Sequence, residues 1–297
     1  MLHTQLNILN CFGYACGHGA RDVGCEQGPD LLRSMDIIPI LTSHHTSVRW
    51  KEMIRPSGFL QNKGDNYAII SELTARLADS ISQTVADSHQ FLVVGGDHSC
   101  AIGTWGGVYR TLGKAEPFGL IWIDAHMDSH SPTTSLSGAI HGMPLACLLG
   151  EGDERLTHIG GLGTKLSPKD VVMIGIRSFE NGEKNFLQDH GVRVYYMDEV
   201  ANRGFEAVFN EALRHIKSRC NKYGISLDLD AIEPDDAPGV GTPEPDGINA
   251  TDLLSALNRI KGDTHLLGME ITELNPLRDV DRKTAALALK IAETVFS

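Results

Sequence analysis

GLIWIDAHMDSHSPTTSLSGAIH, residues 119–141, is the stretch that decides the fold and the chemistry expected of this chain. An apolar run from Gly119 ends in Asp124-Ala-His126-Met-Asp128, which predicts a strand over 119–124. Alternate side chains of an extended chain share one face, so Asp124, His126 and Asp128 point at one spot if the strand geometry continues. Three such groups on one side predict a cation site.

Three other apolar runs end in similar polar groups. The run 91–94 leads into Gly-Gly-Asp-His98, a second run ends in Ser-Leu-Asp228-Leu-Asp230, and a third in Met-Glu-Ile-Thr-Glu273. By the same alternation, Asp228 and Asp230 share one face. Four strand ends therefore carry the polar groups that matter.

Short apolar runs alternate with helical patterns along the whole chain. The predicted strands are 6–11, 91–94, 119–124, 171–174, 192–196, 224–229 and 265–269. The predicted helices are 30–34, 65–88, 101–112, 144–149, 182–189, 205–218, 250–261 and 282–296. This alternation predicts an α/β fold with a mainly parallel sheet covered on both faces. We see no linker or repeat, so one domain over 1–297 is expected, with ligands bound beyond the carboxyl ends of the strands.

Composition narrows the class of protein. Hydrophobic residues make up 41% and charged residues 22%, which allows a sizeable core. A formal charge of -12 disfavours nucleic acid or an anionic membrane as partner, and is compatible with a small cationic substrate. The six cysteines form no C-x-x-C pair, and we see no secretory signal and no run that could span a bilayer. These features predict a cytoplasmic protein with reduced thiols.

Four aspartates and two histidines thus converge on one crevice. Packed together without a cation, so many carboxylates repel one another, and no Lys or Arg lies within the motifs to compensate. Six ligands exceed the needs of one catalytic zinc, and their mixture of carboxylate and imidazole suits two divalent ions of the manganese type, with Asp124 and Asp228 as bridges. A two-metal centre of this kind predicts metal-assisted hydrolysis.

The motifs resemble those of the ureohydrolase family, which includes arginase and agmatinase. GGDHS at 95–99, DAHMD at 124–128, SLDLDAIEP at 226–234 and the MEITELNP block match the family's signatures in type, order and approximate spacing. The resemblance implies a three-layer α-β-α fold and a hydrolase that converts guanidino compounds to urea and an amine with two Mn²⁺ ions. The metal ligands it implies are His98, Asp124, His126, Asp128, Asp228 and Asp230.

The resemblance also implies roles in catalysis. A metal-bridging hydroxide attacks the guanidinium carbon, and Asp128 passes its proton to the leaving amine. His141 shuttles protons to and from solvent, Glu273 orients the guanidinium, and Thr242 lies near that site.

The loop 132–141 resembles that of arginase more than that of agmatinase. Ser135 and Ser137 are therefore expected to accept an amino acid's α-carboxylate, and Glu180 to pair with its α-ammonium group. Arginases usually have asparagine where this chain has His130 and Ala139, and aspartate where it has Glu180. His130 is nonetheless kept as a candidate substrate-binding residue, and the leading hypothesis is an arginase that produces urea and ornithine.

Three alternatives stay open at this point. The first is another ureohydrolase, acting on agmatine or a guanidino acid. The second is a metal-dependent amide deacetylase, which predicts one zinc per chain. The third is a metal-stabilised scaffold without turnover. The family resemblance further implies a homo-oligomer, either a trimer or a hexamer.

Overall fold

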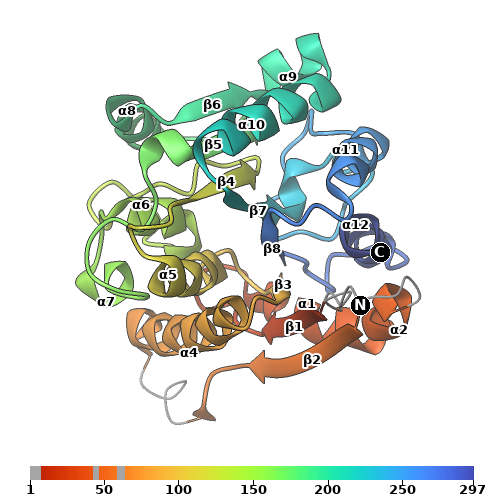
Figure 1. Cartoon of the computed structure of the whole chain (residues 1–297), viewed down its shortest axis with the longest axis horizontal. Helices are drawn as coiled ribbons and strands as arrows, with labels where there is room; N and C mark the ends of the chain where they lie inside the picture. The colour runs from red at the N-terminus through yellow and green to blue at the C-terminus, as the bar shows by residue number, and fades with distance from the viewer. Residues whose placement is uncertain (1–7, 43–46, 59–63) are drawn as a thin grey trace, which may run out of the picture.

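The computed structural model describes residues 8–42, 47–58 and 64–297. Within these residues, eight strands form one parallel sheet in the order β2-β1-β3-β8-β7-β4-β5-β6 (Figure 1). The strands are β1 (Ile8–Tyr14), β2 (Ser47–Ile54), β3 (Gln90–Gly95), β4 (Phe118–Ile123), β5 (Val171–Ile176), β6 (Arg193–Tyr196), β7 (Lys222–Asp228) and β8 (Leu266–Thr272).

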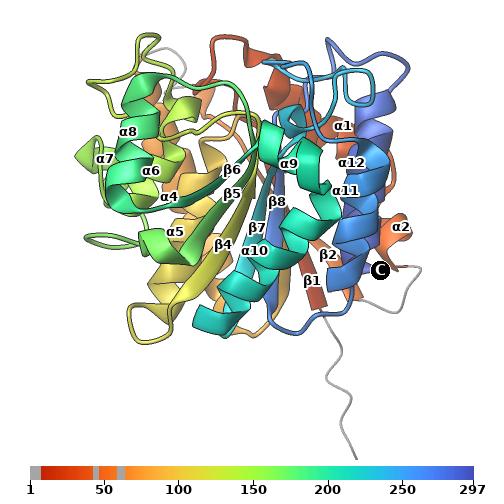
Figure 2. The same cartoon turned by 90° about the horizontal axis from the view of Figure 1, so that it is seen from above.

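Helices cover both faces of this sheet because its inner strands are apolar on both sides. Every residue of β4 and β8 is buried. One face packs against α1 (Gly28–Ser34), α2 (Ile37–Thr42), α9 (Met197–Arg203), α10 (Phe205–Arg219), α11 (Ala250–Leu257) and α12 (Lys283–Phe296). The other packs against α4 (Asn66–Ala86), α5 (Cys100–Leu112), α6 (Pro144–Leu149), α7 (Glu154–Thr157) and α8 (Asn181–His190). The predicted three-layer α-β-α architecture with a parallel sheet is therefore confirmed (Figure 2).

The longest helix shows how sequence spacing becomes packing. The large aliphatic side chains of α4 recur at helical spacing and are buried against α5 and the sheet; they are Ile69, Ile70, Leu73, Leu77, Ile81 and Val85. The Asp65 carboxylate accepts a hydrogen bond from the backbone N–H of Ala68 at 3.1 Å, which satisfies one of the free donors of the first turn.

Several predicted boundaries were wrong, and one strand was missed. Strand β2 lies at the sheet edge and is only half-buried, so it lacks the continuous apolar run of an inner strand. The first two residues of the predicted strand 6–11 lie outside the described residues, and β1 continues to Tyr14. The helix predicted over 250–261 ends at Leu257 and continues as a 3-10 turn, Asn258–Ile260.

One glycine of the inner sheet makes room for a large side chain. A Cβ on Gly224 of β7 would lie 2.1 Å from the ring atom Cζ3 of Trp105 on α5. Glycine at this position therefore lets the indole of Trp105 lie flat against the strand. From there its Nε1–H donates a hydrogen bond to the buried carboxylate of Glu270 on β8 at 2.6 Å.

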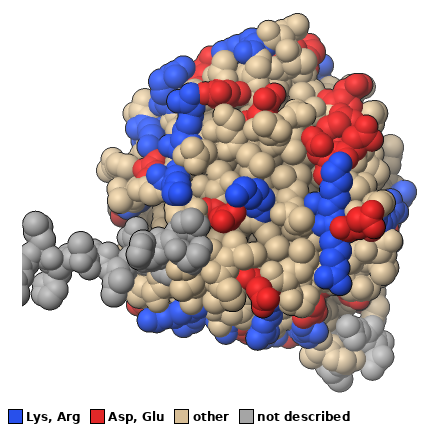
Figure 3. Space-filling view, turned by 90° about the vertical axis from the view of Figure 1, so that its right-hand side faces the viewer, with Lys and Arg blue, Asp and Glu red and all other residues tan. Residues whose placement is uncertain are grey.

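The charged side chains on the surface and the cysteine thiols lie where the amino-acid composition predicts them. The face beside α11 and α12 carries basic and acidic side chains interspersed with one another (Figure 3). The six cysteines are all buried and free, as expected of small apolar groups. Among the described residues, no helix combines the length and the hydrophobicity needed to cross a bilayer.

Candidate metal centre

The chain leaves the extended conformation immediately after β4. The strand ends at Ile123, the residues that follow form a loop, and Asp128 has a left-handed backbone with φ of 46°. The prediction that strand alternation orients the three DAHMD side chains was therefore wrong. Similarly, β7 ends at Asp228, and Asp230 lies in a 3-10 turn. The carboxylates still converge, because parallel strands bring these loops to one edge of the sheet.

Two groups of side chains that could hold a cation lie side by side. In the first, Nδ1 of His98 lies 3.2 Å from Oδ2 of Asp124, and 3.1 Å from Oδ2 of both Asp128 and Asp228. In the second, Nδ1 of His126 lies 3.1 Å from Oδ2 of Asp230 and 3.7 Å from Oδ1 of Asp124. Asp124 belongs to both groups, one carboxylate oxygen to each, as expected of a bridging ligand.

The chemistry of these donors fits a pair of divalent cations. The Nδ1 atom of His98 is buried and has no hydrogen-bond partner, although three carboxylates surround it. Burial and, to a smaller extent, the negative charges of Asp230 and Asp124 raise the pKa of Asp228. Burial and the charge of Asp124 raise the pKa of Asp128 to about 6. A positive charge between the carboxylates removes this repulsion.

A buried hydrogen-bond chain fixes the ring of His98. Nε2 of His98 lies 2.8 Å from the hydroxyl of Ser226, and this hydroxyl donates to Oε1 of Glu270 at 2.6 Å. Since the hydroxyl proton of Ser226 is directed to Glu270, the hydroxyl oxygen of Ser226 accepts the proton on Nε2 of His98. The other ring nitrogen, Nδ1, is then left with a lone pair for a cation. In parallel, Nε1 of Trp122 donates to Oδ2 of Asp124 at 2.8 Å while its ring stacks on His98, with 4.4 Å between ring centroids.

Substitution Ser226→Ala is expected to weaken metal binding about 10- to 100-fold, because it removes the acceptor that fixes the His98 tautomer. Competition with a metal-sensitive dye measures the affinity. Ser99→Ala is the matched control, since Ser99 is also buried but its hydroxyl is bonded to Asp97 and Tyr14. Equal metal affinities of the two variants would count against the positioning role.

Glu273 and His141 form an ion pair beside the two groups. Oε1 of Glu273 accepts the backbone N–H of His98 and lies 2.9 Å from Nδ1 of His141, whereas Oε2 is buried and has no partner. Although burial opposes protonation, the Glu273 carboxylate raises the pKa of His141 to about 9. Burial also disfavours the charged carboxylate, but His141 keeps the pKa of Glu273 below its usual value. Like Asp128, Glu273 has a left-handed backbone, with φ of 65°, which a non-glycine residue adopts at a cost.

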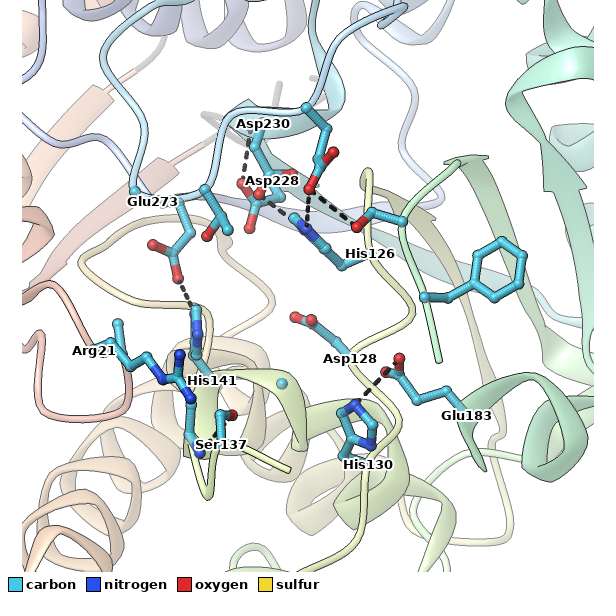
Figure 4. Close-up of a pocket in the computed structure, with 18 of the residues that line it drawn as sticks. Arg21, His126, Asp128, His130, Ser137, His141, Glu183, Asp228, Asp230 and Glu273 are labelled. Carbon is cyan, nitrogen blue, oxygen red and sulfur yellow. Dashed lines mark hydrogen bonds and ion pairs between the residues drawn. The ribbon is translucent and has the colours of Figure 1, made fainter. Parts of the chain in front are cut away.

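A cavity of about 450 Å³ opens above these groups (Figure 4). His126, Asp128, Asp228 and Asp230 line its floor together with Glu273, while His98 and Asp124 are buried beneath. The predicted residues that line its walls are His130, Ser137, His141, Glu180 and Thr242. The structure thus brings the six predicted metal ligands and most of the predicted substrate residues to one place.

The hydroxyl loop is arranged as a set of turns. The Ser135 oxygen accepts the backbone N–H of Gly138 at 3.0 Å, and the Ser137 oxygen accepts that of Ala139 at 3.1 Å. Ser137 and Ala139 line the cavity, whereas Ser135 is not among the residues that line it. The predicted contact between Ser135 and the substrate stays a prediction.

Two predicted substrate residues contact each other. Nε2 of His130 is hydrogen-bonded to the Glu180 carboxylate and lies 3.3 Å from Oε2 of Glu183. Glu183 was not predicted from the sequence. It is buried, and this burial raises the pKa of its carboxyl group to about 8. Glu180 and Glu183 form the capping box of α8, so the E-x-x-E spacing at a helix start was a usable signal.

Other residues of the cavity carried no motif in the sequence. Arg21 and Asp22 come from the glycine-rich loop before α1, and Glu244 comes from the loop before α11. Oε1 of Glu244 lies 3.6 Å from Nε2 of His126 and accepts a hydrogen bond from Ser178. These residues lie far apart in the sequence and only the fold brings them together.

Comparison with known proteins agrees with this geometry. The family model described as "Arginase family" matches residues 9–297. The chain is 38% identical to the arginase of Bacillus caldovelox over 294 residues, which cover 97% of each chain. Its structure resembles the crystal structure of arginase from Bacillus subtilis, with a TM-score of 0.90, 33% identity and coverage of 98% of this chain and 99% of the other. It also resembles the Entamoeba histolytica arginase crystallised with L-ornithine, with a TM-score of 0.89, 29% identity and 99% coverage of both chains.

Proposed function

Because the chain belongs to the arginase family, and so is a hydrolase that acts on guanidino compounds, we propose that it hydrolyses L-arginine to L-ornithine and urea with two manganese ions bound in this centre. The observation that carries the proposal is the pair of donor groups at the floor of the cavity, which share the buried carboxylate of Asp124. Carboxylate and imidazole donors in this mixture suit manganese better than a softer metal.

Each ion would have its own donors in this proposal. His98 and Asp128 would hold one ion and His126 and Asp230 the other, while Asp124 and Asp228 would be shared, and Asp124 already belongs to both donor groups. When bound, such a pair supplies Lewis acidity that allows water to lose a proton at neutral pH.

The chain's own groups then bind the guanidinium and move protons. The free Oε2 atom of Glu273 accepts a guanidinium N–H, and the absence of a side chain at Gly241 leaves space in front of it. Water adds to the guanidinium carbon, and Asp128 carries the proton of this water to the departing amine. His141, partly exposed at the cavity wall and kept protonated by Glu273, exchanges protons with solvent. Breaking the bond from carbon to the chain nitrogen then releases urea and ornithine.

The substrate panel is the direct test of this function. Urea release is measured from arginine, agmatine and guanidinobutanoate at defined manganese concentrations, together with the metal content of the protein. We expect arginine to be hydrolysed with two manganese ions per chain. Negligible turnover of arginine beside rapid turnover of another compound would replace arginase with another ureohydrolase. One zinc per chain would favour the deacetylase, and a fully loaded but inert protein would favour the scaffold.

Assembly and location are part of the same proposal. We propose a cytoplasmic homo-oligomer, either a trimer or a hexamer, on the strength of the family resemblance. Light scattering coupled to size-exclusion chromatography measures the mass, for which the chain contributes 32.3 kDa. A monomer at micromolar concentration would contradict the assembly.

A further inference from the structure

A single guanidinium group stands out in an acidic cavity. Among the described residues that line it, Arg21 is the one Lys or Arg. The acidic residues that line the same cavity are Asp22, Asp128, Glu180, Glu183, Asp228, Asp230, Glu244 and Glu273. A guanidinium in such surroundings is expected to pair with one of these carboxylates unless they have other partners.

Three of these carboxylates have other partners. The Asp22 carboxylate binds Arg278 at 2.9 Å and also accepts from the backbone of Gly24. Glu180 and Glu183 are both engaged by His130 on the far wall of the cavity. In the part of the chain that the structure describes, no carboxylate lies within ion-pair distance of Arg21, whose side chain is exposed at the cavity mouth. Its charge is therefore available to a ligand.

The backbone that carries Arg21 is held firmly against the site. The Gly19 N–H donates to the buried carboxylate of Asp97 at 2.7 Å, and its carbonyl accepts the backbone N–H of His141 at 3.1 Å. A Cβ at Gly19 would lie 2.7 Å from Oδ1 of Asp97, so only glycine allows this close approach. On the other side, Asp22 caps the 3-10 helix Val23–Gln27. Arg21 thus projects from a short segment that is anchored at both ends.

The position of Arg21 fits one end of an elongated substrate. Figure 4 shows Arg21 beside Ser137 and His141, on the side of the cavity away from His130 and Glu183. The guanidinium end is bound deep in the cavity by Glu273, so the other end of the substrate lies towards the mouth. The Ser137 oxygen accepts the backbone N–H of Ala139, and its proton can be donated to a ligand when the Ser135 hydroxyl, 3.4 Å away, is the donor between the two serines. A guanidinium and a hydroxyl donor side by side match a carboxylate.

We propose that Arg21 binds the carboxylate of the substrate at the cavity mouth and so selects guanidino acids over guanidino amines. This inference rests on the proposed function, and it adds a specificity residue from the N-terminal loop to it. Because the ion pair forms equally in the bound substrate and in the transition state, its loss raises KM and leaves kcat unchanged.

The test compares substrates that differ in the carboxylate. For Arg21→Ala we expect the KM for arginine and for guanidinobutanoate to rise roughly ten-fold, the gain typical of a charge-assisted hydrogen bond. The KM for agmatine, which has no carboxylate, is expected to change less than about two-fold on the same grounds. Arg21→Lys keeps the charge and is expected to recover part of the loss. The control is Arg214→Ala, an exposed arginine on α10.

Two results would overturn the inference: an unchanged KM for the guanidino acids, or an equal rise with agmatine. Calorimetry separates this failure from a failure of the proposed function, because it needs no turnover. With manganese-loaded protein, Arg21→Ala is expected to weaken the binding of ornithine roughly ten-fold more than that of putrescine, the same diamine without a carboxylate. If the wild type releases no urea, the proposed function fails, and this comparison of ornithine with putrescine still decides the role of Arg21.

Discussion

Asp128→Asn is expected to lower the kcat of urea release by roughly a thousand-fold, as the loss of a general acid–base group commonly does. The carboxylate has two tasks in the proposed mechanism, since it contacts His98 in the first donor group and carries a proton to the leaving amine. Asparagine preserves the shape of the side chain but provides neither the charge nor the basicity. The initial rate of urea release with saturating arginine and manganese measures the effect.

The fold is expected to survive this substitution. Asparagine tolerates a left-handed backbone such as that of Asp128 better than most residues. Removing one of several crowded carboxylates also relieves repulsion in the metal-free protein, so its unfolding temperature is expected to stay the same or rise. Asp36→Asn provides the control, because Asp36 is exposed and has a similar backbone, with φ of 59°. An Asp128→Asn enzyme that keeps more than a tenth of the wild-type rate would refute the proton-carrying role.

The sequence predicted the sheet because buried parallel strands leave a simple pattern. Strands such as β4 and β5 are continuous apolar runs, and turns and helices separate the strands along the chain. Edge strand β2 was missed because all of its residues except Ile54 are exposed or only partly covered, so it has no such run. The short helices α2, α7 and α9 were missed for a similar reason, since a helix of one or two turns is too short to show a period.

The predicted ligands converge in the structure, although the backbone conformation predicted for them, a continued strand, was wrong. Asp128 and Asp230 do not continue the strands that precede them, and their directions come from a left-handed residue and a 3-10 turn. The convergence was predictable because the strand ends of a parallel sheet lie at one edge, and this does not depend on the exact path of each loop. Their binding of metal remains a prediction.

The walls of the cavity were less predictable than its floor. His130 and Glu180 were expected to contact the substrate, yet they are hydrogen-bonded to each other, and Glu183 lies beside the same imidazole. Arg21 was not identified at all, because it lies about a hundred residues before the loop it faces. Single residues on flexible-looking loops leave no periodic or motif signal, so only the folded chain shows which of them line one cavity.

Removal of the metal is expected to abolish urea release and to lower the unfolding temperature, and adding manganese back should restore both. A ligand that binds only the folded state stabilises a protein by about 2.7 kcal/mol when the free ligand concentration is 100 times the Kd, so two metal sites give roughly twice that. For a chain of this size the corresponding shift is on the order of 10 °C. The loss is expected to be reversible, because Ser226 and Trp122 hold His98 and Asp124 in place without the metal.

The measurement is differential scanning calorimetry after treatment with a chelator, followed by titration with manganese and an assay of urea. Chelator already saturated with manganese is the control for effects of the reagent itself. Asp228→Asn removes a shared carboxylate and is expected to show a smaller shift between the metal-free and metal-loaded states. A chelated protein with an unchanged unfolding temperature would mean that the buried carboxylates are stable without a cation. In that case the repulsion argument for the metal centre fails, whatever the activity.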